Sequence, residues 1–228
     1  MALASPCRVL EVVVSMAASE EARTLAEQAA TAGYPVLFVA DTCFRKVSAL
    51  RHSDGIAAIV EVHIHQDLPP SDEQPVIVTW QLQDPGNLGS IVRSATAMGC
   101  RRIVTVEPSV DALHPLCIRA TAGTLFLSKI WQLDAAEARA WLAAQSPRVA
   151  VLSARGTISL QCAAATPPQI LLVGNEARGV PDDVTTGMHS VAIPMAPEVE
   201  SLNVNAAAAI ALYTLWGSRL PRTSPQDQ

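Results

Sequence analysis

Short apolar runs alternate with amphipathic or polar segments along the whole chain. In the first third, the segment that begins at Ser19 and stops at Gly33 has helical spacing, and a second helix is expected from Asp41. The apolar runs around these segments are residues 8–15, 35–40 and 55–62. A polar, proline-bearing stretch without period follows at 63–75. We therefore predict a small α/β unit over residues 1–75 that ends in a linker.

The remaining residues repeat the alternation on a larger scale. Helical or Gly/Pro-bearing segments separate apolar runs near 76–80, 102–106, 125–131, 148–152, 169–173 and 190–193. This pattern is typical of a mostly parallel sheet with flanking helices, in which ligands bind outside the carboxyl ends of the strands. We predict that this α/β domain spans residues 76–218 and that 219–228 form a flexible polar tail.

Composition favours a soluble, intracellular protein. Half of the 228 residues are hydrophobic and 16% are charged, which excludes disorder for most of the chain. Five cysteines without C-x-x-C spacing suit the reducing cytosol better than a disulfide framework or a zinc site. Glu11 interrupts the signal-like start, and no run approaches the roughly 18 apolar residues of a membrane helix. We expect a cytoplasmic protein without a membrane partner.

Charge is unevenly distributed. The net charge of −5 argues against a nucleic-acid partner, because Lys and Arg supply most phosphate affinity. Residues 1–75 carry five basic against ten acidic residues, whereas 87–129 carry five basic against two acidic residues. The basic residues of the second segment are Arg93, Arg101, Arg102, Arg119 and Lys129. The excess of basic residues in 87–129 means that the net charge does not exclude a phosphate-binding surface on the second domain.

The first motif is "DPGNLGSIVRSATAMGC", residues 84–100, between two apolar runs. Its opening residues favour a turn, Asn87 is expected to cap the helix that follows, and Gly99 is a reasonable end. Arg93 lies off the apolar stripe, on a flank of this helix. Taken alone, Arg93 is either a solvated arginine or a functional cation.

Two further motifs follow later strands. In "ILLVGNEARGVPDDV", an apolar strand runs into Gly174 and Glu176, and the carboxylate either caps a neighbouring amide or serves a site at the strand end. In "VAIPMAPEVESLNVNAAAAIALYTLW", Ser201 and Asn203 open an alanine-rich helix. Both are ordinary cap residues, and the small side chains allow close approach of another backbone.

Together the three motifs resemble the SpoU (TrmH-type) family of the SPOUT superfamily. The resemblance rests on "NLGSIVRSA", "GNEARG" and "IPM…SLNVNAA", in the family's order, and covers about Val76 to Gly217. It implies a C-terminal trefoil knot and a homodimer that packs through helices beside the knot. It further implies an AdoMet-dependent methyltransferase that modifies a ribose 2′-hydroxyl in rRNA or tRNA.

The resemblance also implies roles for individual residues. AdoMet is expected to contact Gly174, Ile193, Met195 and Leu202, largely through backbone groups. The polar active-site set is expected to comprise Arg93, Glu176, Ser201 and Asn203, with Asn87 in support. Because a free guanidinium stays charged at neutral pH, a cationic Arg93 that grips a phosphate and eases alkoxide formation is the easier physical interpretation.

RNA contacts beyond this set are expected from Arg101, Arg102 and Arg119, with surface solvation as the alternative for each. The N-terminal unit resembles the ribosomal-protein-like RNA-binding domain of many SpoU enzymes, although it is acidic and starts late. Its basic cluster, Arg45, Lys46, Arg51 and His52, is either an RNA contact or plain solvation.

Other functions explain fewer features. A catalytically inactive RNA-binding or ribosome-assembly factor on the same scaffold is the main alternative, but the polar set is complete. A nucleotide-binding metabolic domain would explain the acidity and not the third motif, and no G-x-G-x-x-G follows a strand. His63 and His65 lack a third ligand, so no metal is expected.

Overall fold

The chain divides into two compact units between His63 and Ile64. The computed structural model describes residues 7–48 and 53–220, so Arg51, His52 and residues 221–228 lie outside the described residues. The boundary falls earlier than the one expected near Pro75. The reason is that Ile64 and His65 leave the linker and form a short strand in the sheet of the second unit.

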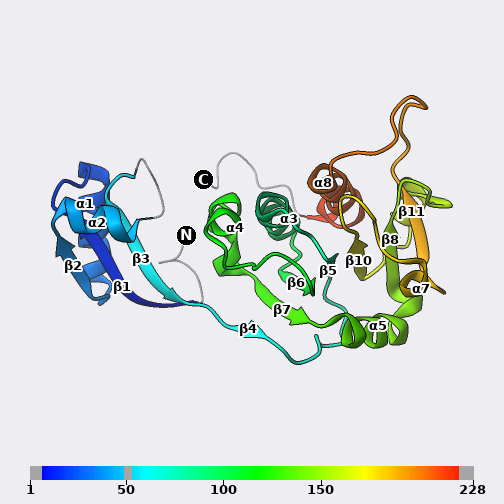
Figure 1. Cartoon of the computed structure of the whole chain (residues 1–228), viewed down its shortest axis with the longest axis horizontal. Coiled ribbons are helices and arrows are strands. Elements are labelled where there is room, and N and C mark those ends of the chain that lie inside the picture. Colours follow the sequence, from blue (N-terminus) through cyan, green and yellow to red (C-terminus); the bar gives the residue numbers. More distant parts are fainter. Residues whose placement is uncertain (1–6, 49–52, 221–228) are drawn as a thin grey trace. The chain divides into compact units, whose positions relative to one another are not determined.

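The N-terminal unit is a three-stranded sheet with two helices (Figure 1). Its elements are β1 (Arg8–Ser15), α1 (Glu20–Thr31), β2 (Val36–Val39), α2 (Asp41–Val47) and β3 (Ile56–Glu61). The strand order is β2-β1-β3, in which β2 is parallel and β3 antiparallel to β1. Ser19 caps α1 as expected, since its side chain accepts a hydrogen bond from the Ala22 N–H.

The core of this unit is made of small side chains. Val12 and Val14 of β1 pack against Ala22, Ala26 and Ala29 of α1, all of them buried. These alanines recur three or four residues apart, so they share one face of α1 and let the helix lie close to the sheet. The unit therefore has a small core of its own, separate from the two clusters of the second unit.

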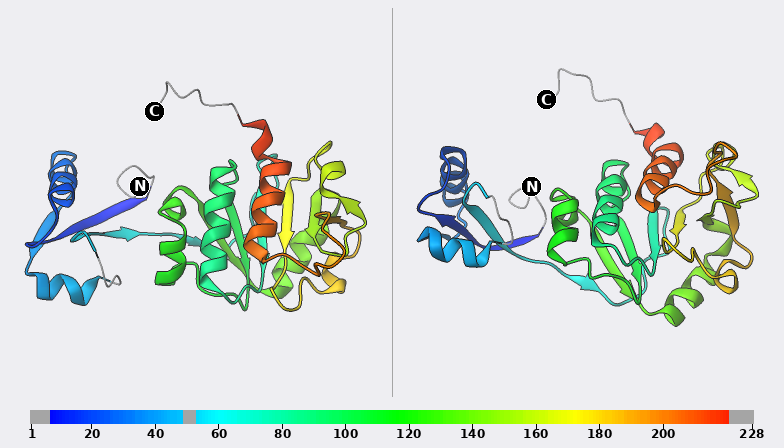
Figure 2. Two further views of the ribbon diagram at one scale, coloured as in Figure 1. Left: turned by 90° about the horizontal axis from the view of Figure 1, so that it is seen from above. Right: turned by 45° about the horizontal axis from the view of Figure 1, so that its top comes forward.

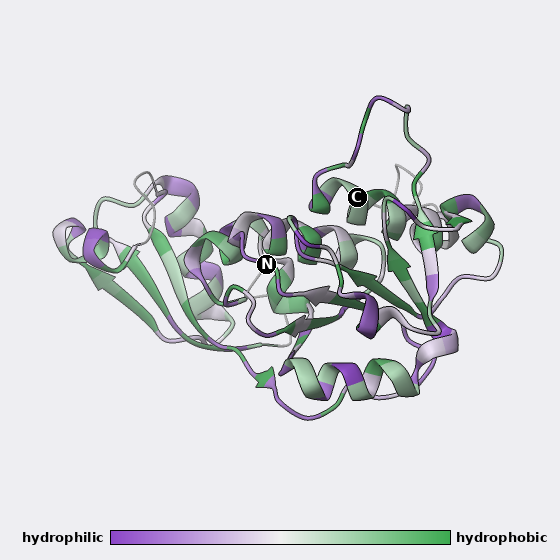
Figure 3. Cartoon of the chain, turned by 45° about the vertical axis from the view of Figure 1, so that its right-hand side comes forward, coloured by the Kyte–Doolittle hydropathy of each residue, from purple (hydrophilic) through white to green (hydrophobic). Residues whose placement is uncertain are grey.

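The second unit contains an eight-stranded sheet in the order β4-β7-β6-β5-β10-β8-β11-β9, and all of its paired strands are parallel. The strands are β4 (Ile64–His65), β5 (Val76–Trp80), β6 (Arg102–Val106), β7 (Lys129–Leu133), β8 (Val149–Leu152), β9 (Ile158–Ser159), β10 (Ile170–Val173) and β11 (His189–Ala192). The expected parallel α/β fold is confirmed. The ribbon is coloured as hydrophobic along most strands of both units (Figure 3), in agreement with their buried apolar residues.

Helices cover both faces of this sheet (Figure 1). They are α3 (Pro85–Ala97), α4 (Pro115–Ala120), α5 (Ala135–Ala144), α6 (Leu160–Ala163), α7 (Asp182–Thr185) and α8 (Val204–Leu215), with 3-10 turns at Thr124–Leu127, Ser146–Arg148 and Gly217–Arg219. Alternate strand residues separate the faces: Ile77 packs with α3, α4 and α8, whereas Val76 and Val78 pack with α5. The result is a three-layer α/β/α domain.

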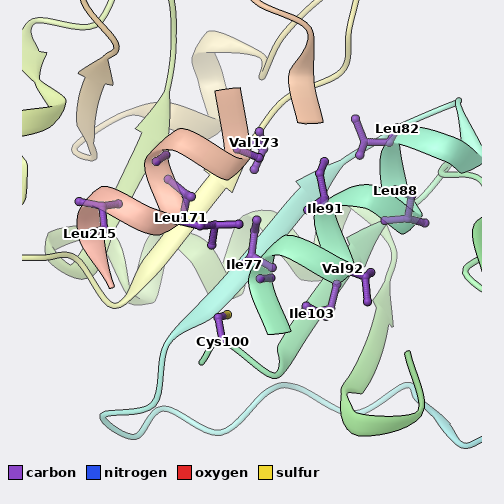
Figure 4. Packing of buried hydrophobic residues seen from close by; sticks show 14 of the residues in the cluster. Ile77, Leu82, Leu88, Ile91, Val92, Cys100, Ile103, Leu171, Val173 and Leu215 are labelled. Atoms are coloured by element: carbon purple, nitrogen blue, oxygen red, sulfur yellow. The ribbon is translucent and has the colours of Figure 1, made fainter. Parts of the chain in front are cut away.

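Helix α3 lies at the centre of one layer, between α4 and α8 (Figure 2). Its Ile91 and Val92 point into the cluster that contains Ile77 of β5 and Leu171 of β10 (Figure 4). Gly89 allows the close approach of α4, because a Cβ there would lie 2.4 Å from the Cys117 carbonyl oxygen. This packing fixes the position of the first turn of α3.

One expected strand is shorter than its apolar run. Residues 125–131 form the end of a 3-10 turn and only then the start of β7 at Lys129. Gly123 adopts a positive φ of 87° and turns the chain, and Leu125 packs into the core from the turn. An apolar run by itself does not distinguish a buried turn from a strand.

Candidate active site

Helix α3 begins three residues earlier than the sequence suggests. Asp84 is the N-cap, and its Oδ1 accepts a 2.7 Å hydrogen bond from the Asn87 N–H, with Pro85 at the first helical position. The expectation that Asn87 caps the helix is therefore wrong. Because Asp84 caps the helix, the Asn87 side chain can hydrogen-bond to the loop after β10.

The Asn87 side chain joins all three motifs. Its Nδ2 donates to Glu176 Oε1 at 3.0 Å, and its Oδ1 accepts from Asn205 Nδ2 at 3.0 Å and from Asn203 Nδ2 at 3.4 Å. We call these four residues the carboxyl-edge cluster, since they follow the carboxyl ends of β5, β10 and β11. Segments more than eighty residues apart thus meet at one amide.

The loop after β10 positions Glu176 through its backbone. A Cβ on Gly174 would lie 2.4 Å from the Gly179 carbonyl carbon, so only glycine permits this tight loop. Asn175 pins the loop, because its Nδ2 donates to the Gln81 carbonyl at 2.7 Å and its Oδ1 accepts from the Ala177 N–H at 2.9 Å. Glu176 is exposed within the turn that the backbone pair Asn175–Gly179 closes.

The third motif supplies two asparagines to the cluster. Asn203 is the N-cap of α8, as the sequence indicates, and its Oδ1 accepts a 2.9 Å hydrogen bond from the Asn205 N–H. Asn205 was not identified from the sequence. A polar residue in the first turn of a helix is common, and only its 3.0 Å contact with Asn87 shows that it belongs to the site.

Arg93 and Ser201 are placed near the cluster in sequence but not bonded to it. Arg93 is exposed on α3, and a rotation of about 100° per residue puts it about 120° around the helix from Asn87. Ser201 is exposed in the loop before α8. Neither hydrogen-bonds to the carboxyl-edge cluster within residues 7–48 and 53–220. Both remain accessible to a ligand.

The expected cofactor residues lie at the ends of adjacent strands. Gly174 follows β10, and Ile193 and Met195, both half-buried, follow β11. Leu202 exposes its side chain just before α8. Gly156, which was not expected, approaches the same region, because a Cβ there would lie 2.4 Å from the Val191 carbonyl carbon. Apolar side chains and glycine-lined backbone suit a flat aromatic base with a polar tail.

The residues expected to contact RNA differ in their exposure and in their partners within the protein. Arg101 and Arg119 are exposed, as is Lys46, while Arg45 forms an i,i+4 ion pair with Asp41 at 2.7 Å. Arg102 is engaged elsewhere: its guanidinium binds both carboxylate oxygens of Asp72, at 2.5 and 2.8 Å, and its side chain is only 11% exposed. The described structure therefore gives Arg102 a structural role.

Asp72 belongs to a second polar cluster at the opposite end of the strands. Arg148 donates to the Asp72 carbonyl at 2.6 Å, Gln145 donates to Ser71 at 2.7 Å, and Gln169 bonds to Glu73. We call Ser71, Asp72, Glu73, Arg102, Gln145, Arg148 and Gln169 the amino-edge cluster. The Arg102 hydrogen bond lowers the pKa of Asp72.

Neither a metal-ligand group nor a membrane-spanning helix occurs among the residues that the structure describes. Among those that the structure describes, no group of three or more His, Cys, Asp or Glu side chains is placed to hold a metal ion. His65 stacks on Trp131 with ring centroids 4.8 Å apart. None of the described helices has the length and apolar character to cross a bilayer.

The chain is similar in sequence to proteins named as RNA methyltransferases. A chain described as an uncharacterized tRNA/rRNA methyltransferase from Synechocystis sp. is 32% identical over 196 residues, which are 77% of this chain and 66% of that relative. A 23S rRNA (uridine(2479)-2′-O)-methyltransferase from Streptomyces viridochromogenes is 35% identical over 143 residues, 60% of this chain and 50% of the relative. The chain thus spans between half and two thirds of these two curated relatives.

A solved structure extends the comparison to most of the chain. The SpoU methyltransferase AviRb from Streptomyces viridochromogenes, in complex with the cofactor AdoMet, superposes with a TM-score of 0.78 at 25% identity and covers 94% of this chain and 84% of its own. The SpoU rRNA Methylase family matches residues 74–213, which include the whole carboxyl-edge cluster. The chain belongs to the SpoU rRNA methylase family.

Proposed function

We propose that the protein transfers a methyl group from AdoMet to a ribose 2′-hydroxyl of rRNA or tRNA. The observation that carries the proposal is the carboxyl-edge cluster, in which Asn87 holds Glu176 by a 3.0 Å hydrogen bond. Relatives named as 23S rRNA 2′-O-methyltransferases, and the AdoMet complex of AviRb, support the same reaction.

Glu176 is the proposed acceptor of the ribose hydroxyl proton. An ionised carboxylate accepts hydrogen bonds only, and the Asn87 Nδ2 donor matches this state. Glu176 has this one hydrogen-bond partner within the described residues and is exposed, so its remaining lone pairs are free for a hydroxyl. As the oxygen bonds to the methyl carbon, the bond from that carbon to the sulfonium sulfur breaks, S-adenosylhomocysteine is the leaving group, and the hydroxyl proton passes to the carboxylate.

AdoMet supplies an activated methyl group, and the chain's task is to hold the acceptor in line with it. The residues proposed to hold AdoMet are Gly174, Ile193, Met195 and Leu202. Gly174 and Gly179 bring two backbone segments together, and the apolar side chains offer a surface for the base. Leu202 immediately precedes Asn203 of the cluster, which links donor and acceptor sites.

Arg93 is proposed as the clamp for the phosphate beside the target ribose, with Arg101 and Arg119 as further phosphate contacts. It is an exposed cation on the helix that presents Asn87, and a guanidinium stabilises negative charge that forms on the attacking oxygen. Ser201, exposed two residues before the α8 cap, is proposed to contact the same nucleotide. Arg45 and Lys46 remain candidates for RNA contact by the N-terminal unit.

A homodimer is proposed to form through α8. Ile210 and Tyr213 lie three residues apart on this helix and are exposed, Tyr213 by 59%. An apolar helix face of this kind suits a two-fold interface. Sedimentation equilibrium is expected to show a dimer that Tyr213→Glu converts to monomer. A monomeric wild-type protein would contradict the interface.

The trefoil knot and a cytoplasmic location also remain predictions.

The function is tested by mapping 2′-O-methyl groups. RNA from cells that lack the gene is incubated with the purified full chain and radiolabelled AdoMet, and the modified ribose is located by site mapping. We expect one or a few new 2′-O-methyl sites in rRNA or tRNA. RNA binding without transfer would contradict the methyltransferase and favour an inactive RNA-binding factor.

A further inference from the structure

Asn205 is the one member of the carboxyl-edge cluster to which neither its motif nor its position assigns a role. It lies in the first turn of α8, half-buried, and its Nδ2 is 3.0 Å from Asn87 Oδ1. Asn203 approaches the same oxygen at 3.4 Å while its own Oδ1 caps the helix. The shorter bond and the uncommitted side chain make Asn205 the principal donor to Asn87.

The direction of these hydrogen bonds is chemically determined. A side-chain amide has a carbonyl that only accepts and an NH2 that only donates. If Asn205 donates to Asn87, the Asn87 oxygen faces α8, and the Asn87 NH2 must face Glu176. A reversed Asn87 would place two NH2 groups together on one side and two acceptor oxygens together on the other.

We infer that Asn205 is a positioning residue that sets the orientation of the Asn87 amide and thereby keeps the Glu176 carboxylate in place as a proton acceptor. This inference rests on the proposed function, and it assigns to α8 a part in the chemistry beyond capping. Asn205 touches no reacting atom. It acts through Asn87, which in turn donates to the carboxylate at 3.0 Å.

Asn205→Asp separates this role from a structural one. The substitution keeps the shape of the side chain and replaces its donor by an acceptor, so that two oxygens face each other at Asn87. An acidic residue in the first turn of a helix interacts favourably with the helix dipole. A purely structural residue would therefore tolerate aspartate, and thermal unfolding should show equal or higher stability.

Turnover is expected to change in the opposite direction. In single-turnover methyl transfer at saturating AdoMet and RNA, Asn205→Asp should be slower by about tenfold or more, the scale of one misdirected charge-assisted hydrogen bond. AdoMet affinity measured by calorimetry should stay within about twofold, because Asn205 is not among the residues proposed to hold AdoMet. Asn205→Ala, which removes the donor without adding an acceptor, should be slowed less.

A double-mutant cycle with Asn87→Ala completes the test. If Asn205 acts through Asn87, Asn205→Asp should cause less than about a twofold further loss in the Asn87→Ala background. Full activity of Asn205→Asp, or an undiminished loss in that background, would overturn the inference while the wild-type enzyme still methylates RNA. An inactive wild-type protein would instead contradict the proposed function.

Discussion

The two edges of the eight-stranded sheet carry polar clusters of opposite character. At the amino edge, Arg102 and Arg148 satisfy Asp72 and its neighbours, so charges are paired within the protein. At the carboxyl edge, neutral amides surround a single exposed carboxylate, Glu176, that no cation of the described chain pairs. The first arrangement is complete in itself, whereas the second leaves binding capacity for a ligand.

Charged residues of one chain can thus be divided into those paired within the protein and those left exposed for a ligand. Arg93 and Arg102 both occur in the basic segment 87–129. Arg102 hydrogen-bonds to Asp72, whereas Arg93 is exposed on α3. Substitutions at the amino edge should therefore change stability, and substitutions at the carboxyl edge should change activity.

Glu176→Gln should have the largest effect. Glutamine can still accept the Asn87 hydrogen bond, but it cannot take a proton from the ribose hydroxyl. We expect the single-turnover rate to fall by about 100- to 10,000-fold, the range for loss of a general base. Stability by urea unfolding should change by less than about 0.5 kcal/mol, as at exposed sites. Activity near that of the wild type would exclude Glu176 as the acceptor.

Arg93→Ala should lower methyl transfer by roughly 100-fold, the scale of one lost electrostatic stabiliser. Arg93→Lys should recover little, because it keeps the charge and loses the planar fork. AdoMet titration should give an unchanged affinity for both variants, since other loops form the proposed pocket. A solvated Arg93 would instead leave the rate of Arg93→Ala unaltered.

Arg102→Ala should lower the free energy of unfolding by about 1–3 kcal/mol, because it removes a two-bond contact to Asp72 from a side chain that is only 11% exposed. Transfer by the folded variant should stay within about twofold of the wild type. Its neighbour Arg101 is exposed and serves as the matched control, and Arg101→Ala should change stability by less than about 0.5 kcal/mol. Equal destabilisation by both variants would contradict the pairing.

Asp72→Asn should have the smallest effect, a loss of stability that is present at neutral pH and disappears in acid. The Arg102 hydrogen bond lowers the pKa of Asp72 from its ordinary 3.8, so the ionised carboxylate stabilises the fold. This contribution is complete above about pH 5 and is lost as pH falls through the lowered pKa. The stability difference between wild type and Asp72→Asn should therefore be constant from about pH 5 to 7 and shrink below about pH 4. A difference independent of pH down to about pH 2 would show that the charge of Asp72 does not contribute.

Local patterns predicted the elements, but they did not predict which side chains would meet. The caps Ser19 and Asn203 and the parallel strands followed from sequence, because capping and burial act over a few residues. The Asp72–Arg102 pair and the Asn87–Asn205 contact join residues 30 and 118 positions apart, and nothing local specifies them. Asn87 was misassigned for a different, local reason: Asp84 also suits the cap position, and Pro85 at the first helical position favours it.

Two buried cysteines beside α3 allow the rate at which this helix layer opens to be measured by thiol labelling. Burial raises the pKa of Cys100, which follows α3, and of Cys117, which packs under Gly89, to about 12 in each case. Both thiols thus stay protonated and unreactive at neutral pH, whereas Cys43 and Cys162 are exposed. Alkylation should label the exposed pair at once, and the slow labelling of Cys100 and Cys117 would report how often the α3 layer opens.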